Sequence, residues 1–366
     1  MVIGYDARVL SSLRTRGIGT YLLGLLHQFA RDPENRLVLF SNHDLVLPPA
    51  LKAVTDTQVF PFRGDRFFGW EQFGLPPKAN KVGVDLMHSP ADSGPWWQPK
   101  PWVVTIHDTC LLDGDEDENP RNLYFFRNWL PRISRRARFV LTVSEYSRRN
   151  LIERFGLPDS KVVRVYHGRD EALQNPPSQE KQDAFRRKHG LSSPLVFSIG
   201  MALPRKNSRL LLRVFNQLHQ RMNGVCTAMA GVEDSFAAEA RALSPQTVFM
   251  PFLGRDEIQV LHHLASVFVS ASLKEGFGFP VLDAITAGKP VVFSNDASFP
   301  EVAGDGGLAV DGRSEADVLR ALERILSDAE LRETCAANAR RQAQKFSWSD
   351  AAEQTLAVYK RAVLPA

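Results

Sequence analysis

The sequence has few cysteines and no long apolar run. Its 366 residues contain three cysteines, Cys110, Cys226 and Cys335, which lie far apart and form no CxxC pair. This excludes a disulfide scaffold and indicates a reducing compartment, in which we expect each cysteine to be a buried small hydrophobe. No apolar stretch approaches the roughly 18–20 residues that a membrane-spanning helix needs. The N-terminus MVIGYDARVL shows no signal peptide pattern, so we expect a cytoplasmic protein.

Length and composition indicate a two-domain globular protein. Hydrophobic residues make up 44% of the chain and charged residues 23%, which excludes a disordered chain or a fibre. A chain of 366 residues fits two domains of roughly 150–200 residues each.

The net charge of +4 is unevenly distributed. Residues 1–170 hold 23 Lys/Arg against 19 Asp/Glu, whereas residues 171–366 hold 22 of each. Five of the 19 acids lie in the run Asp113–Glu118, so the remainder of the first half is distinctly basic. Such a field suits phosphates, an anionic lipid surface or nucleic acid.

Short apolar runs alternate with amphipathic stretches in both halves of the chain. The alternation predicts an α/β protein with two doubly wound parallel sheets, whose ligands bind at the carboxyl ends of the strands. Ser144 is the expected N-cap of a helix at 146–155. Residues 168–193 are polar and contain Pro176-Pro177, so we expect the domain linker there. The predicted strands are 2–6, 37–40, 85–88, 102–107, 139–144 and 162–167 in the first half, and 195–200, 225–231, 248–253, 267–271, 290–295 and 308–310 in the second.

The segment Glu275–Asp283, EGFGFPVLD, follows one predicted strand and opens a helix. Its glycines and Pro280 favour a helix N-terminus that can bind an anion. Carboxylates beside a phosphate repel it unless they face hydroxyls, so Glu275 and Asp283 favour a hexose and a ribose as partners. A tight turn with a helix-capping acid remains the alternative.

Two further loops follow predicted strands. In Gly200–Asn207, the adjacent cations Arg205 and Lys206 can neutralise a diphosphate, and a solvated basic loop is the alternative. In Arg16–Tyr21, Gly17 and Gly19 allow close backbone approach to a phosphate or sugar, but Leu22 stands where a dinucleotide-binding fingerprint requires its third glycine.

Three more features each have a functional and a structural interpretation. His107, at the end of the strand Thr105–Asp108, can hydrogen-bond substrate hydroxyls in a cleft, or it is structural. We expect the acidic run at 113–118 to be a solvated loop, because no ordered ligand spacing supports a metal, and a Mg²⁺ or Mn²⁺ site is the alternative. The aromatic and basic segment 125–136 suits anionic lipid headgroups, or it is a packed helix with a basic face.

The order of these motifs resembles that of retaining glycosyltransferases with the GT-B fold, in the large group 1 (family 4) class. The resemblance covers nearly the whole chain and reaches to a bacterial surface-polysaccharide branch, which contains mannosyltransferases. The matching segments are Gly17–Tyr21, Thr105–Asp108, Val143–Arg149, Pro204–Asn207, Glu275–Ala284, which carries the E-x7-E signature, and Ser294–Asp305.

The resemblance implies two Rossmann-like domains facing each other across a cleft. The N-terminal, acceptor-side domain would span residues 1–170, the nucleotide-sugar-binding domain 171–348, and a helix at 349–366 would cross back. The implied reaction moves a hexose, mannose in the first place, from a nucleotide diphosphate sugar to a saccharide or lipid-linked saccharide acceptor. GDP is the favoured nucleotide and UDP the second. Retention at the anomeric carbon, no metal and no other cofactor are implied, in polysaccharide, lipopolysaccharide or glycolipid synthesis.

The resemblance also implies roles for individual residues. Arg205 and Lys206 would hold the diphosphate, Glu275 the donor-sugar hydroxyls and Asp283 the ribose, while His107 would contact the donor sugar. The remaining donor contacts would be Gly17, Gly19, Leu253, Gly276, Phe277, Gly278 and Phe279. Two departures stand out: Asp283 replaces the usual glutamate, and Tyr166-His167-Gly168 replaces the usual Pro-Asn-Gly.

Other classes fit the sequence less well. A sugar-nucleotide dehydrogenase or epimerase needs an intact glycine fingerprint and a Tyr-x-x-x-Lys pair, and neither is present. A non-enzymatic nucleic-acid binder suits the basic charge, but no recognition motif supports it, so we expect no nucleic-acid partner. Glycogen synthase or phosphorylase remains an alternative within the same fold, although the chain is short for either.

Overall fold

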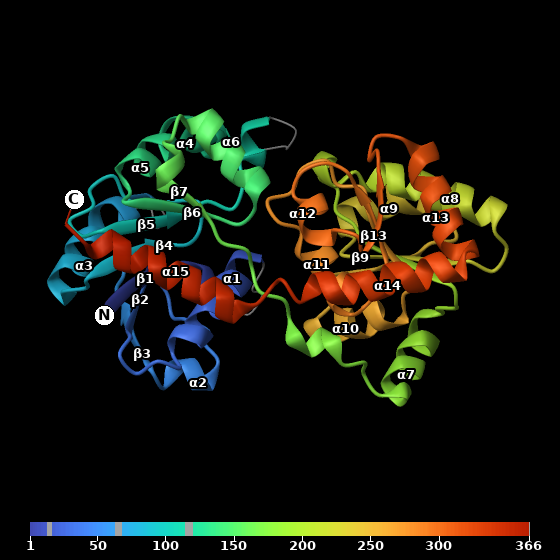
Figure 1. Ribbon diagram of the computed structural model, residues 1–366, viewed down its shortest axis with the longest axis horizontal. Helices are drawn as coiled ribbons and strands as arrows, with labels where there is room; N and C mark the ends of the chain where they lie inside the picture. The colour runs from blue at the N-terminus through green and yellow to red at the C-terminus, as the bar shows by residue number, and fades with distance from the viewer. Residues whose placement is uncertain (13–16, 63–67, 114–119, 366) are drawn as a thin grey trace. The chain divides into compact units, whose positions relative to one another are not determined.

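The structure is a computed structural model that describes residues 1–12, 17–62, 68–113 and 120–365. These residues form two compact units (Figure 1). Unit 1 combines the described residues before Arg169 with the C-terminal segment from Ser347, and unit 2 runs from Arg169 to Phe346. Each unit has its own parallel sheet, so the predicted α/β architecture with two doubly wound sheets is confirmed.

Unit 1 is built on a seven-stranded parallel sheet in the order β3-β2-β1-β4-β5-β6-β7. Side chains alternate between its two faces, as the pleat of a strand requires. On β1, Ile3 and Tyr5 face α1 and α15, whereas Val38 and Phe40 of β2 face the cluster that contains α3, α5 and α6. The strands are β1 (Val2–Asp6), β2 (Arg36–Ser41), β3 (Thr55–Val59), β4 (Leu86–Ser89), β5 (Trp102–Thr105), β6 (Phe139–Thr142) and β7 (Val162–Arg164).

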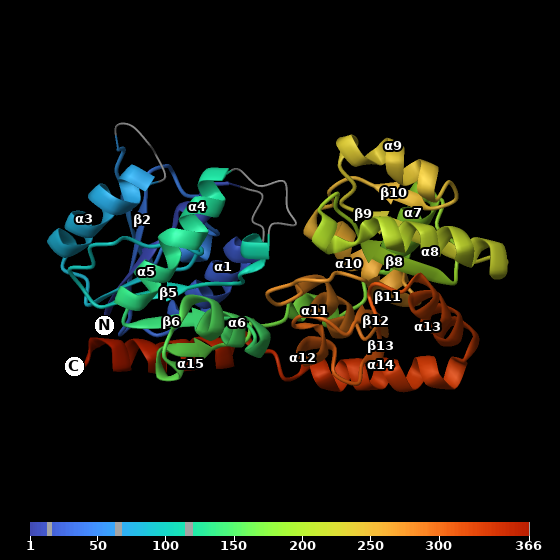
Figure 2. The same ribbon diagram turned by 90° about the horizontal axis from the view of Figure 1, so that it is seen from above.

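The helices of unit 1 cover both faces of this sheet (Figure 2). The C-terminal helix α15 belongs to this unit and packs against α1, β4 and β5. The predicted N-cap is confirmed, because the Ser144 hydroxyl accepts a hydrogen bond from the Ser147 N–H at 3.0 Å. The helices are α1 (Gly17–Phe29), α2 (Pro49–Lys52), α3 (Leu75–Val82), α4 (Pro120–Asn128), α5 (Leu130–Arg136), α6 (Glu145–Phe155) and α15 (Trp348–Val363).

Unit 2 is built on a six-stranded parallel sheet in the order β10-β9-β8-β11-β12-β13. The strand order reverses between β8 and β11, which makes this pair the topological switch point of the sheet. The strands are β8 (Leu195–Ile199), β9 (Cys226–Ala230), β10 (Val248–Met250), β11 (Val267–Ser270), β12 (Val291–Ser294) and β13 (Gly307–Val310). The helices are α7 (Gln179–His189), α8 (Ser208–Arg221), α9 (Asp234–Leu243), α10 (Arg255–Leu264), α11 (Phe279–Thr286), α12 (Phe299–Ala303), α13 (Glu315–Ser327) and α14 (Ala329–Ala343).

The expected linker at 168–193 is wrong for residues 179–189. Residues 179–189 form α7, which packs against α10 within unit 2. The Ser178 hydroxyl caps its first turn and Gly190 ends it in the left-handed conformation, while Phe185 is its single buried side chain. A helix with one buried residue shows no apolar stripe, which is why hydrophobic periodicity missed it.

Membrane-spanning helices and disulfides are both absent from the described residues. None of the helices found there is both long and apolar enough to span a bilayer. All three cysteines are buried and form no disulfide, so the expectation that they act as buried small hydrophobes is confirmed.

Candidate functional site

The strongest candidate site lies at the switch point of the unit 2 sheet. The loop after β8 carries Arg205 and Lys206, and the loop after β11 carries Glu275. Because β8 and β11 are hydrogen-bonded neighbours, their carboxyl ends bring the two loops together. In doubly wound sheets this crevice is where ligands bind. The two sequence motifs therefore meet at one place.

Glu275 pairs with both predicted cations. Its Oε1 accepts a hydrogen bond from the Lys206 ammonium, and its Oε2 lies 3.5 Å from the Arg205 guanidinium. The three side chains retain 13–18% of their accessible surface, so they are sheltered but reachable. Two cations share one carboxylate, which leaves a net positive charge of one at the cluster. Such a cluster attracts a diphosphate while its carboxylate accepts hydrogen bonds from hydroxyls.

The cation loop is held by bonds from its own residues. The Asn207 amide donates to the Gly312 carbonyl at 2.7 Å, with Asn207 in the left-handed conformation at φ 54°. The Ser208 hydroxyl donates to the Met201 carbonyl at 2.8 Å and accepts from the Met201 N–H at 3.0 Å. The Arg205 carbonyl accepts from the Leu273 N–H at 2.8 Å. These bonds fix the loop before any ligand arrives, which is the preorganisation that charge stabilisation requires.

The glycine loop before α11 is held from behind by Ser298. The Ser298 hydroxyl lies 2.8 Å from the Phe277 carbonyl and 3.1 Å from the Glu275 carbonyl. Gly278 has φ 95°, and a Cβ there would lie 2.7 Å from the Phe299 ring. Only glycine therefore fits at this position. Gly276, Phe277 and Gly278 are buried, and Phe279 begins the helix.

Asp283 lies in the second turn of α11. Its carboxyl is near Asp170 and Arg255, and Arg255 itself forms an ion pair with Asp170 at 2.5 Å. Burial, with a further contribution from Asp170, raises the pKa of Asp283 to about 7, and Arg255 opposes the shift. Asp283, Asp170 and Arg255 thus form a second polar cluster of the same unit, in which the carboxyl of Asp283 titrates near neutral pH.

Leu253 lies in the loop between β10 and α10. It follows β10, which is separated from β8 by β9, and its side chain is 7% exposed. The neighbouring Phe252 is largely exposed. Arg255, two residues further on, connects this segment with Asp170.

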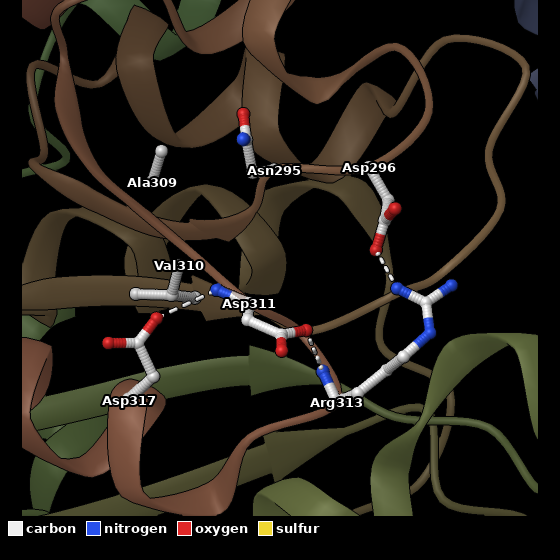
Figure 3. A pocket seen from close by; sticks show the side chains of 7 residues that line it. All are labelled: Asn295, Asp296, Ala309, Val310, Asp311, Arg313 and Asp317. Carbon is white, nitrogen blue, oxygen red and sulfur yellow. Dashed lines mark hydrogen bonds and ion pairs between the residues drawn. The ribbon is translucent and has the colours of Figure 1, made fainter.

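A polar pocket of about 290 Å³ lies at the carboxyl ends of β12 and β13 (Figure 3). Its acids are already engaged: Asp296 accepts from Arg313 at 2.6 Å, Asp311 accepts from the Arg313 N–H at 2.9 Å, and Asp317 accepts from the Asp311 N–H at 2.8 Å (Figure 3). Gly312, between the lining residues Asp311 and Arg313, accepts the bond from Asn207 and so helps to hold the cation loop.

In unit 1, His107 is nearly buried at the end of β5. Its backbone N–H donates to Asp92 Oδ1 at 2.6 Å, and its ring Nε2 lies 2.9 Å from the Pro90 carbonyl. A carbonyl only accepts, so Nε2 carries the proton. Burial lowers the pKa of His107, which favours the neutral ring. The rings of Tyr21 and His167 lie 5.1 Å and 5.6 Å from it.

A buried hydrogen-bond chain runs beside His107. Tyr359 of α15 donates to Tyr5 at 3.3 Å, so its oxygen accepts from His88 Nδ1 at 2.6 Å. His88 Nε2 then accepts from the Thr105 hydroxyl at 2.7 Å, and Thr105 accepts from Tyr21 at 3.0 Å. Burial lowers the pKa of His88 to about 3, consistent with one protonated nitrogen. Tyr359, His88, Thr105 and Tyr21 thus each donate to one acceptor, and these hydrogen bonds join α15 to β1, β4, β5 and α1.

The glycine loop of unit 1 is only partly described. Gly17 is the exposed first residue of α1 and Gly19 is buried in its first turn. Arg16 lies outside the described residues. Apart from the backbone of Asp113, the acidic run at 113–118 also lies outside them. Within the described ranges, no group of three or more His, Cys, Asp or Glu side chains is arranged to hold a metal ion.

Sequence reasoning missed four residues that shape these clusters. Tyr21 and His167 contact His107, Ser298 holds the glycine loop, and Arg255 pairs with Asp170. His167 carried a signal, since it departs from the Pro-Asn-Gly pattern. The other three contacts join residues far apart in the chain and left no local signature.

Family comparisons cover most of the chain. Residues 15–173 match the family described as Glycosyltransferase Family 4, and residues 180–342 match Glycosyl transferases group 1. The chain is 30% identical to O-antigen chain mannosyltransferase B of Escherichia coli over 272 residues, which is 70% of each protein. It is 29% identical over 287 residues to the serotype-specific mannosyltransferase WbdA of E. coli, and this match covers 74% of the chain but spans only about a third of WbdA.

Solved structures share the fold at lower identity. A glycosyltransferase from Rickettsia africae superposes with a TM-score of 0.77 at 16% identity, covering 100% of this chain and 99% of the other. Anabaena Alr3699/HepE in complex with UDP-glucose superposes with a TM-score of 0.76 at 18% identity, covering 98% and 99%. The lipopolysaccharide biosynthesis glycosyltransferase WaaG gives 0.74 at 15% identity, covering 97% and 98%.

Proposed function

Because the chain belongs to the group 1 glycosyltransferases, we propose that it transfers mannose from GDP-mannose to a saccharide acceptor in surface-polysaccharide synthesis. UDP-hexose is the second donor. The acceptor is a saccharide, free or lipid-linked. Two mannosyltransferase relatives support the choice of sugar, and the two cations that share one carboxylate support a nucleotide diphosphate donor.

The observation that carries the proposal is the contact of Arg205 and Lys206 with Glu275 at the switch point of unit 2. In this assignment the two cations bind the diphosphate, and Glu275 accepts hydrogen bonds from the donor-sugar hydroxyls. The buried Gly276–Gly278 loop and Phe279 line the same side, and Asp283 accepts from the ribose. His107, Gly17, Gly19 and Leu253 are the remaining proposed donor contacts.

The proposed reaction proceeds with retention at the anomeric carbon. The bond from the anomeric carbon to the diphosphate oxygen breaks, and a bond from the acceptor oxygen to that carbon forms on the same face. The acceptor proton passes to the leaving phosphate. Charge develops on that phosphate, where a preorganised cation contributes about 3–4 kcal/mol to transition-state stabilisation. Arg205 and Lys206 supply this charge, so the proposal needs neither a metal nor an enzymatic nucleophile.

Calorimetric titration with GDP, UDP, ADP and NAD, each with and without EDTA, tests the proposal. We expect GDP to bind more tightly than UDP and ADP, with the same affinity in EDTA. Tighter binding of UDP would reassign the base. Loss of binding in EDTA would overturn metal independence, and binding of NAD alone would overturn the glycosyl donor. Incubation with GDP-mannose should then release GDP, and an anomer-resolved NMR spectrum of the product decides retention.

We also propose that a basic face of unit 1 contacts an anionic membrane. Residues 127–164 hold ten Lys/Arg against three Asp/Glu. Arg127 and Arg132 are exposed on α4 and α5, beside the exposed Tyr124. Exposed cations next to an aromatic ring suit the headgroup region of anionic lipid.

Sedimentation with phosphatidylglycerol vesicles at low salt tests this contact. We expect the protein to sediment with these vesicles but not with phosphatidylcholine vesicles, and R127E/R132E to lose binding. The matched control is R187E/R241E, which reverses two exposed cations of unit 2. Equal loss in both double variants would indicate an unspecific charge effect, and no binding by the unaltered protein would reject the contact.

A further inference from the structure

His167 is a buried histidine at the position where the chain departs from its family pattern. It lies in the segment after β7, immediately before Gly168 in the sequence, and is 2% exposed. Its ring stacks on that of His107, with centroids 5.6 Å apart and an interplanar angle of 28°. The asparagine expected from the family pattern has no aromatic face and could not make this contact.

The stacked pair is enclosed by two further rings. Tyr21 lies 5.1 Å from each histidine, edge-on to His107 at 85° and tilted by 58° to His167. Trp348, the first residue of α15, lies 5.9 Å from His167 on another side. A Cβ at Gly168 would lie 2.3 Å from Trp348, so the chain after His167 runs directly against the indole. His167 therefore has little room to rotate.

Among the residues that the structure describes, the His107 ring makes a single polar bond, between Nε2 and the Pro90 carbonyl at 2.9 Å. One hydrogen bond at Nε2 does not by itself fix the rotation of the ring about its Cβ–Cγ bond. A neighbouring ring stacked on the face removes this freedom. We propose that His167 is a positioning residue that fixes the plane of the His107 ring for contact with the donor sugar. The inference rests on the proposed function of His107 as a donor-sugar contact.

The electrostatics favour two neutral rings in this stack. Burial lowers the pKa of both histidines, and the proximity of His107 lowers that of His167 further. The other titratable groups that bear on the pair are Tyr21, His88, Asp92 and Asp108, of which Asp108 opposes the shift at His107. Neutral rings stack without charge repulsion, so the contact persists at neutral pH.

The binding test compares GDP-mannose with GDP by calorimetry for H167A, H167N, H167F and H107A. We expect H167A, H167N and H107A each to weaken GDP-mannose by about tenfold, with GDP affinity within about twofold of the unaltered protein. H167F keeps an aromatic face and should restore most of the GDP-mannose affinity. The double variant H107A/H167A should be no weaker than H107A alone, because His167 acts through His107. H43A, at an exposed histidine of the same unit, is the matched control.

A second readout does not depend on the donor. Long-range ¹H–¹⁵N correlation spectra of the free protein report the tautomer and the ring environment of His107. We expect its signals to shift in H167A and H167N and to return towards their original positions in H167F. Wild-type GDP-mannose affinity in H167A, additive losses in the double variant, or unchanged His107 signals would each overturn the inference. If the unaltered protein binds neither GDP-mannose nor UDP-glucose, the proposed function fails, and the His107 signals alone decide the role of His167.

Discussion

The ammonium of Lys206 and the carboxylate of Glu275 form an ion pair although 69 residues separate them in the chain. Each side chain belongs to a loop that follows one of two adjacent strands, β8 and β11. Both are mostly buried, at 16% and 13% exposure. Removing either side chain therefore leaves the other as a sheltered charge that has lost this partner. Loss of Lys206 makes the cluster less attractive to an anionic ligand, and loss of Glu275 makes it more attractive.

We expect Lys206→Ala and Glu275→Ala each to reduce glycosyl transfer by about 100-fold or more, the scale observed for the loss of one preorganised donor. Their nucleotide affinities should differ. Lys206→Ala removes a cation and weakens GDP binding, whereas Glu275→Ala removes the carboxylate that neutralises Arg205 and Lys206 and leaves GDP binding equal or tighter. Steady-state kinetics and calorimetry with GDP measure the two effects separately.

The matched control is the exposed ion pair of Arg209 and Glu239 in the same unit, with an N–O distance of 2.6 Å. Arg209→Ala and Glu239→Ala should leave transfer within about twofold, because exposed pairs contribute little. Near-normal turnover in Lys206→Ala or Glu275→Ala would remove these residues from the active site.

The sequence was sufficient to predict which loops form the site, but not which of these loops contact each other. Strands β8 and β11 are short apolar runs followed by the loops that carry Arg205-Lys206 and Glu275, so alternation of strand and helix placed both motifs at carboxyl ends. The ion pair itself depends on which strands are neighbours, and strand order is a tertiary property. The same reason explains why Tyr21 and Ser298 were missed.

Some secondary structure was missed because its sequence is polar. Strand β3 has the sequence TDTQV and lies at the edge of the unit 1 sheet, where no residue needs to be fully buried. Helix α7 buries Phe185 alone. Capping defines the ends of α7, and pairing with one neighbouring strand defines β3. Both elements lack the apolar periodicity on which prediction depends.

Gly278→Ala should destabilise unit 2 and abolish the site. The residue has φ 95°, and the added Cβ would lie 2.7 Å from the Phe299 ring. Left-handed strain and the clash together should lower the free energy of unfolding by about 1–3 kcal/mol. Urea unfolding followed by circular dichroism measures this change, and calorimetry with GDP measures the loss of binding.

Gly254→Ala is the control for this substitution. Gly254 has φ −70°, and a Cβ there meets nothing within 4 Å. We expect its unfolding midpoint to stay within the error of the unaltered protein. A similar, small change in both alanine variants would contradict the assigned role of Gly278 in shaping the loop.

Asp283 should make both stability and nucleotide binding depend on pH near neutrality. Its pKa is about 7 in the folded protein, raised chiefly by burial, against about 4 for an unfolded aspartate. Between these values the folded state holds a proton that the unfolded state has lost, so this group stabilises the fold at acidic pH and the contribution disappears as pH rises through 7. Asp283→Asn removes this dependence.

The measurement is the difference in unfolding free energy between Asp283→Asn and the unaltered protein, from a pH below the unfolded pKa of aspartate to a pH above the folded pKa of Asp283. We expect the variant to gain about 1–4 kcal/mol relative to the unaltered protein from the acidic to the alkaline end. GDP affinity of the unaltered protein should rise over the same range, because an ionised carboxylate accepts both ribose hydroxyls, and stay flat in the variant. Asp256→Asn, at an exposed acid of the same unit, is the control, and an equal pH dependence in both variants would reject the assignment to Asp283.

Tyr359→Phe should destabilise unit 1 although it removes a single oxygen. That oxygen accepts from His88 Nδ1 at 2.6 Å and donates to Tyr5 at 3.3 Å, inside a fully buried cluster. Without it, the buried His88 N–H loses the Tyr359 oxygen as its acceptor, which costs about 1–3 kcal/mol of stability. The direction of the hydrogen bonds in this cluster also predicts that Tyr21→Phe lowers stability less, because Tyr21 is the terminal donor and the bond from Thr105 to His88 remains. Urea unfolding of both variants, with Tyr124→Phe at an exposed tyrosine as the control, decides the order. A larger loss in Tyr21→Phe than in Tyr359→Phe would mean that the hydrogen bonds run in the opposite direction along the chain.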